Sequence, residues 1–211
     1  MRGLQIAVLG AALAAATRAQ NEWTSYGGDP EGMRYSRLSQ INAGNVSKLK
    51  LAWQYGVKPA NTDGSVPNRI VPSTEAVPIM AGGLLFTPTV GHSIVALEPE
   101  NGKEFWKYDL PGGVAAPLRG VTYWPGNSQQ AARIFAGLSN GRLIALNAKT
   151  GKLVPGFGDE GVLDLRAGVT ARFPDAPYHM SSPGAIFQNL LITGAQVKED
   201  DPDGPAMDVR A

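Results

Sequence analysis

The chain has 211 residues, including 26 glycines and 16 prolines; 43% of it is hydrophobic, 18% is charged, and the formal net charge is +1. This composition is typical of a folded, turn-rich protein, because disordered chains combine low hydrophobicity with high net charge, and near-neutrality gives no indication of a nucleic-acid partner. The absence of cysteine excludes a disulfide scaffold, a cysteine-ligated zinc or iron–sulfur site and a thiol nucleophile.

Residues 1–19 have the pattern of a secretory signal peptide. A basic start at Arg2 precedes an apolar run over residues 4–16, and the small Ala19 suits cleavage before Gln20. The run is about 13 residues long, whereas a membrane-spanning helix needs about 20, so an uncleaved anchor is the less favoured alternative. We therefore expect export of the chain, to the periplasm in a bacterium, and leave open whether the exported protein associates with the membrane.

After the signal, the sequence predicts an all-β chain. Asn42 followed by residues 43–49 predicts one or two helical turns. The other regular segments are short apolar or alternating runs bounded by turn-forming residues: 51–57, 84–87, 93–97, 133–136, 142–146 and 190–193. Many short strands separated by frequent turns indicate an all-β architecture.

An internal repeat refines this prediction. Residues 93–103 recur as residues 142–152, with Ala96 and Ala145 49 residues apart, and each copy contains a strand, a polar turn, a glycine and a lysine. A period of about 40–50 residues containing four short strands is typical of a β-propeller blade. A third unit begins near Ser181 and extends to the last residue.

Residues 20–211 are therefore predicted to form about three blades of an incomplete propeller. Propellers close with at least about four blades, because each blade covers the apolar face of its neighbour. We expect the chain to be the N-terminal part of a longer protein. A small independent β-sandwich is the alternative, but it leaves the repeat unexplained.

The first copy of the repeat also carries a recognisable motif. Residues 96–106 follow the pattern Ala-x-Glu-x-x-Asn-Gly-Lys-x-x-Trp, which resembles the tryptophan-docking motif of the quinoprotein dehydrogenases that use pyrroloquinoline quinone (PQQ). In that family the alanine and the tryptophan pack between adjacent blades. The second copy has Pro155 in place of the tryptophan, so weaker docking is expected at that joint.

Further segments extend the resemblance. Residues 23–53, beginning Trp-x-x-Tyr-Gly-Gly, resemble the opening of these enzymes, and residues 119–126 and 141–158 resemble the sugar (glucose) dehydrogenase branch. The resemblance covers residues 21–211 and implies an eight-bladed propeller with PQQ and Ca²⁺. It also implies oxidation of a sugar or alcohol hydroxyl, with electrons passing to a respiratory quinone or cytochrome. A non-catalytic scaffold of the cell envelope with the same docking motif is the alternative.

The resemblance also implies cofactor contacts. PQQ carries three carboxylates and an ortho-quinone, so its site needs cations and hydrogen-bond donors. Arg119 matches an arginine that the family places against PQQ, and a guanidinium can bind a carboxylate or quinone oxygen through two parallel donors. Glu75 matches a glutamate that hydrogen-bonds PQQ. Ser181 matches a hydroxyl residue that touches the cofactor, although a hydroxyl that satisfies a turn is the alternative.

The remaining implied contacts lie further along the chain. Gly194 and Ala195 match the turn under the PQQ ring, and Glu199 falls at the spacing of a calcium ligand, with a solvated acidic loop as its alternative. Residues 196–198 depart from the alcohol-dehydrogenase pattern. No catalytic residue is assigned, because the family takes its aspartate base, a lysine and the other calcium ligands from later blades; this chain alone is not expected to turn over substrate. Residues 49–57 correspond to a strand that completes the last blade, so we expect them to lack that partner here.

Overall fold

The computed structural model describes residues 22–29, 31–57, 75–90, 92–198, 204–205 and 209–211. The predicted signal peptide and Glu199 lie outside these ranges. Within them, the regular structure consists of short strands and one three-residue 3-10 helix, η1 (Val46–Lys48), which confirms the all-β prediction. No helix in the described part of the chain is long and apolar enough to cross a membrane.

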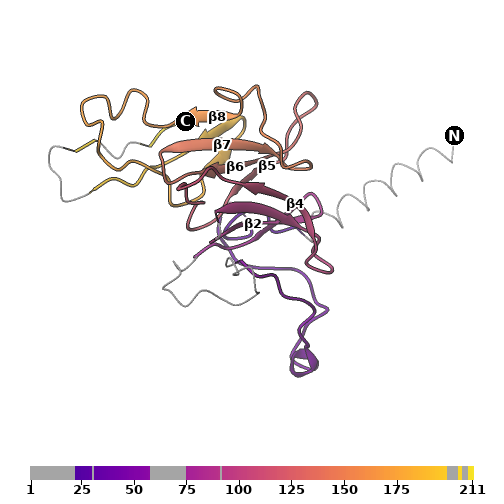
Figure 1. The fold of residues 1–211 in the computed structure, drawn as a ribbon. Helices are drawn as coiled ribbons and strands as arrows, with labels where there is room; N and C mark the ends of the chain where they lie inside the picture. Colours follow the sequence, from indigo (N-terminus) through magenta and orange to yellow (C-terminus); the bar gives the residue numbers. More distant parts are fainter. Residues whose placement is uncertain (1–21, 30, 58–74, 91, 199–203, 206–208) are drawn as a thin grey trace, which may run out of the picture.

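Two four-stranded antiparallel sheets form the body of the molecule (Figure 1). Their strands are hydrogen-bonded in chain order, as in propeller blades. The first sheet contains β1 (Ile79–Ala81), β2 (Leu84–Thr89), β3 (Ser93–Leu97) and β4 (Glu104–Asp109). The second contains β5 (Thr122–Trp124), β6 (Arg133–Gly137), β7 (Arg142–Asn147) and β8 (Val162–Asp164). The two copies of the repeat supply β3 and β7 with the turns that follow them.

The third unit begins with a two-stranded antiparallel hairpin. It consists of β9 (Ala185–Phe187) and β10 (Leu190–Ile192). Thr193, next to the end of β10, exchanges two backbone hydrogen bonds with Arg210, at 2.7 and 2.9 Å. Arg210 therefore pairs where the third strand of a blade would lie.

The core lies between the faces of successive sheets, as Figure 1 shows by the stacking of the β2–β4 and β6–β8 layers. Side chains alternate along a strand, so the central strands bury one set of residues on each face. Phe86 and Ile94 meet Ile134 and Ile144 between the first two sheets. The alternate residues of the second sheet, Phe135, Leu143 and Ala145, face Tyr178 and Met180 at the start of the third unit. Burial on both faces explains why β3 and β7 are continuous apolar runs in the sequence.

Two tryptophans dock onto equivalent turns. Trp106 of β4 donates from Nε1 to the Ala148 carbonyl at 2.9 Å, and its ring covers Gly151. Trp53 makes the same pair of contacts with the equivalent turn, which lies 49 residues earlier in the chain. Its Nε1 donates to the Pro99 carbonyl at 2.9 Å and its ring covers Gly102. Trp53 therefore takes the place of a fourth-strand tryptophan from a unit preceding the first sheet.

Both turns require their glycine. The backbone φ is 70° at Gly102 and 67° at Gly151, a region that side chains disfavour. A Cβ at Gly151 would lie 2.6 Å from the Trp106 ring. Gly151→Ala is therefore expected to lower the free energy of unfolding by about 2 kcal/mol, from the left-handed backbone and the displaced indole together.

Urea denaturation of the chain measures this change. Gly156→Ala is the matched control, since Gly156 is exposed and a Cβ there would meet nothing within 4 Å. We expect the control to stay within about 0.5 kcal/mol of the original chain. Equal destabilisation by the two variants would show that the docking of Trp106 does not depend on Gly151.

The segment before the first sheet forms no strand over residues 51–57. It is attached through Trp53, through the Tyr55 hydroxyl, which donates to Glu104 Oε1 at 2.7 Å, and through one backbone hydrogen bond, from the Val90 amide to the Val57 carbonyl at 3.0 Å. Leu49 and Leu51 are 58% and 77% exposed. The strand predicted over residues 51–57 is therefore wrong for this structure, because a single backbone hydrogen bond to the first sheet does not make a strand ladder. That its partner belongs to another blade stays a prediction.

Candidate functional site

The predicted cofactor residues share one position in three successive units. Glu75, Arg119 and Ser181 lie three or four residues before β1, β5 and β9, the first strands of their units. We call residues 75–78, 118–121 and 181–184, which precede these strands, the first, second and third lead-in loops. The first strands of the second and third units, β5 and β9, are in contact, so their lead-in loops lie side by side. Repetition of the blade therefore brings together residues that are 44 and 62 positions apart.

Backbone contacts join the three lead-in loops. The Glu75 amide donates to the Leu118 carbonyl at 3.2 Å, and the Arg119 amide donates to the Ser181 carbonyl at 3.0 Å. Gly120, at φ 127°, fits between the first and third loops: a Cβ there would lie 3.3 Å from the Val77 carbonyl oxygen. The loops therefore form one connected surface in which Arg119 has a fixed backbone position.

The Arg119 side chain lies between the two flanking loops. Its Nε donates to Glu75 Oε2 at 3.0 Å and its Nη1 donates to the Ser182 hydroxyl at 3.2 Å. The Arg119 and Glu75 side chains are 49% and 55% exposed, and ion pairs with that exposure contribute about 0–1 kcal/mol to stability. The principal consequence of the contacts is the orientation of the guanidinium.

Ser181 and Ser182 have different roles in the structure. Ser181 contributes its carbonyl to the Arg119 amide, while the hydroxyl that contacts the guanidinium belongs to Ser182. Ser181 was predicted from the sequence as the cofactor contact, and Ser182 was not. The adjacent hydroxyls of the Ser-Ser-Pro segment were the available signal, but nothing in the sequence states which of the two faces the arginine.

Gly194 and Ala195 follow β10 and run beside the third lead-in loop. His179 and Gln196 exchange backbone hydrogen bonds at 3.2 and 2.7 Å as an antiparallel bridge, which aligns this segment with Ser181. Gly194 is exposed, and a Cβ there would meet nothing within 4 Å. Ala195 instead packs against the apolar cluster between the second and third units. The structure thus places both residues near the loops, and only Gly194 on the open side.

Arg119 and Ser182 also line a cavity of about 700 Å³. Its walls come from β5, the start of β9 and residues 24–29 and 31–34 of the N-terminal segment, which include Asp29. A second cation lines it: Arg34, whose guanidinium carbon lies 5.4 Å from the centre of the Tyr26 ring. Burial raises the pKa of Tyr123 in the wall, with a smaller contribution from the Glu22 charge, so this phenol is a neutral hydrogen-bond donor at physiological pH. Among the described residues, the cavity therefore combines two cations, Arg34 and Arg119, with one carboxylate, Asp29, a balance that favours an anionic ligand.

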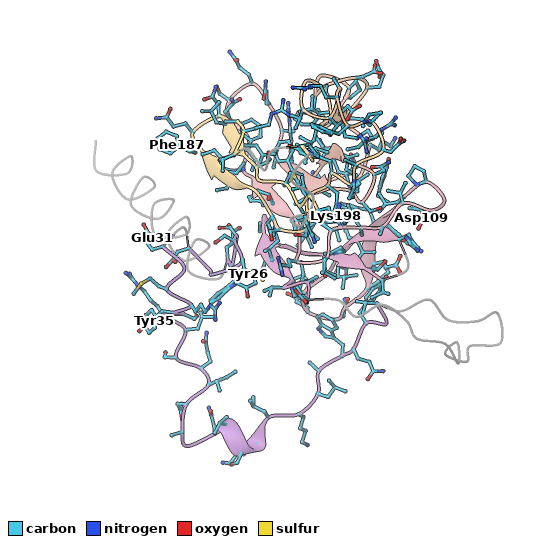
Figure 2. All side chains as sticks on the ribbon, turned by 90° about the vertical axis from the view of Figure 1, so that its left-hand side faces the viewer. Tyr26, Glu31, Tyr35, Asp109, Phe187 and Lys198 are labelled. Carbon is cyan, nitrogen blue, oxygen red and sulfur yellow. The ribbon has the colours of Figure 1, made fainter. Side chains whose placement is uncertain are left out.

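In Figure 2, Tyr26 lies close to the sheets, whereas Tyr35 lies on the arm that extends away from them. Arg34 has φ 53° and its amide donates to the Gly27 carbonyl at 2.9 Å. This turn closes the loop beside the cavity. Tyr26 and Arg34 were part of the opening motif in the sequence, which carried no sign that they reach the same cavity as Arg119.

The described residues contain no group of three or more histidine, aspartate or glutamate side chains placed to hold a metal ion. Glu199, the predicted calcium ligand, lies outside them. The calcium assignment therefore stays a prediction.

The fold and the lead-in loops define a partial β-propeller with an arginine-centred site just before the first strands of its units. A family profile described as "Glucose/ethanol/alcohol dehydrogenase, beta-propeller domain" matches residues 23–211, and the chain belongs to this PQQ-dependent family. The resemblance predicted from the sequence is thereby confirmed.

Individual relatives agree with this membership. The quinoprotein glucose dehydrogenase of Escherichia coli is 34% identical over 199 residues, covering 86% of this chain and 24% of the relative. The dehydrogenase subunit of a Gluconobacter oxydans quinone-dependent alcohol dehydrogenase is 39% identical over 141 residues, covering 63% and 16%. The crystal structure of a Comamonas testosteroni quinohemoprotein alcohol dehydrogenase superimposes with a TM-score of 0.63 at 26% identity, covering 89% and 27%. The chain thus spans about a quarter of the length of most of these relatives.

Proposed function

We propose that this chain forms the first three blades of a periplasmic PQQ-dependent dehydrogenase that oxidises a hydroxyl group of a sugar or an alcohol. Electrons would pass to a quinone or cytochrome of the respiratory chain. The observation that carries the proposal is the placement of Arg119 between Glu75 and Ser182 beside the cavity. Family membership and the names of the relatives, which include glucose and alcohol dehydrogenases, support the reaction class.

The donor set fits the cofactor. Among the contacts of the described residues, Arg119 uses Nε and Nη1, and its Nη2 group makes none of them. Nη2 can therefore donate to a carboxylate or quinone oxygen, and such charge-assisted bonds are stronger than neutral ones. Arg34 and Tyr123 add a cation and a neutral donor in the same cavity. When bound, PQQ supplies the quinone that accepts two electrons from the substrate.

The residues of this chain would bind and orient the cofactor. Arg119 holds an anionic oxygen, Glu75 balances the arginine charge, and Gly194 leaves open space next to the third lead-in loop. Glu199 is proposed as one ligand of Ca²⁺, because carboxylates suit a hard cation. The other metal ligands and the base that takes the hydroxyl proton would come from outside the described residues.

Cofactor titration and turnover test the proposal. The chain is titrated with PQQ in the presence of Ca²⁺ and binding is followed by calorimetry. The full-length gene product, reconstituted with PQQ and Ca²⁺, is assayed for reduction of an artificial dye with a panel of aldoses and alcohols. We expect binding in the first experiment and dye reduction in the second. Absence of both would favour a non-catalytic envelope scaffold.

A further inference from the structure

Arg119 is held by all three lead-in loops at once. Its backbone belongs to the second, Glu75 of the first accepts from Nε, and Ser182 of the third accepts from Nη1. The guanidinium is kept planar by resonance and turns as a unit about the Cδ–Nε bond, so contacts at Nε and Nη1 together fix its position and its orientation. Either contact alone would hold this rotation less firmly.

The third lead-in loop is built to present the Ser182 hydroxyl. Ser181 is fixed by the hydrogen bond from the Arg119 amide to its carbonyl, at 3.0 Å. Pro183 follows, and the residue before a proline is restricted to extended backbone. Pro183 also lies against Gly120, where a Cβ would be 3.6 Å from the proline ring. Ser182 thus stands between two anchored neighbours, so its hydroxyl is positioned before any ligand binds.

We propose that Ser182 is a positioning residue: it holds the Arg119 guanidinium against rotation, so that Nη2 is presented to an anionic ligand in the cavity. Ser182 acts through Arg119 and is not itself a ligand contact in this role. The proposal rests on the proposed function for the identity of that ligand, PQQ. It also makes the binding site depend on the third unit, since Ser182 precedes β9.

The first test needs no cofactor. The solvent exchange rate of the Arg119 Nε–H is measured by NMR in the unliganded chain, with Arg119→Lys used to assign the resonance. Ser182→Ala is expected to raise this rate at least severalfold, because the guanidinium then turns more freely about Cδ–Nε and breaks the Nε–H bond to Glu75 more often. Ser182→Thr, which keeps a hydroxyl, is expected to restore the slow rate. The exposed Ser128, in the loop between β5 and β6, provides the control Ser128→Ala, with no change expected.

The second test is the PQQ affinity of the same variants. Ser182→Ala is expected to weaken PQQ binding roughly 3- to 10-fold, the effect of one hydrogen bond, and Ser182→Thr to recover most of the loss. An unchanged exchange rate in Ser182→Ala overturns the positioning role, as does a changed rate with unchanged PQQ affinity. If the original chain binds no PQQ while the exchange rate still responds, the positioning of Arg119 stands and the proposed cofactor is wrong. Failure of the threonine variant to recover either property also counts against the hydroxyl.

Discussion

Replacing Arg119 with alanine is expected to weaken the binding of PQQ to the chain at least about tenfold. The variant loses a charge-assisted hydrogen bond, a contribution of about 1.5–3 kcal/mol, and 1.4 kcal/mol corresponds to a factor of ten in affinity. The fold should survive, because the Arg119–Glu75 pair is half exposed and contributes little to stability. Calorimetric titration measures the affinity, and the thermal midpoint is expected to fall by no more than about 3 °C.

Two further variants make the result specific. Arg119→Lys keeps the charge but lacks the planar fork, so we expect an intermediate affinity. Arg142→Ala removes another exposed arginine, from β7 and outside the lead-in loops, and should leave PQQ binding unchanged. If Arg119→Ala binds PQQ as tightly as the original chain, Arg119 is not a cofactor residue, and the envelope scaffold becomes the better account of this chain.

Much of the fold could be predicted from the sequence because a propeller repeats a local pattern. The apolar runs of β3 and β7 and the turns at Gly102 and Gly151 are spaced equally in both copies, so one unit predicts the next. The docking of Trp53 was not predicted from the sequence. Its ring docks on a turn 49 residues later in the chain, and local periodicity carries no information about such a distant contact.

The candidate site, too, could be predicted only in part from the sequence. Family resemblance identified Arg119 and Glu75, and the structure joins them although 44 residues separate them. The choice between Ser181 and Ser182 depended on the orientation of two adjacent hydroxyls, which the backbone of a loop decides. Arg34 reaches the cavity through a turn with φ 53°, and no spacing rule predicts that turn. The family resemblance thus located the lead-in loops, whereas the side-chain directions required the three-dimensional structure.

The docking of Trp106 should have the largest effect on stability. The Trp106 ring covers Gly151, lies 5.8 Å from the Phe86 ring between centroids, and donates from Nε1 to the Ala148 carbonyl. Trp106→Ala is therefore expected to lower the free energy of unfolding by roughly 3 kcal/mol, at the lower end of the range for large-to-small aromatic substitutions because the side chain is only half buried.

Urea denaturation followed by far-ultraviolet circular dichroism measures this loss without relying on tryptophan fluorescence. Trp106→Phe keeps a ring over Gly151 and removes the N–H donor, so about 1 kcal/mol of the loss should remain. Phe105→Ala is the matched control: Phe105 precedes Trp106 on β4, points to the opposite face and is 47% exposed. We expect it to cost less than about 1 kcal/mol. Equal losses for Trp106→Ala and Phe105→Ala would mean that the two sheets are joined by their apolar faces alone and that the docking motif adds no stability at this joint.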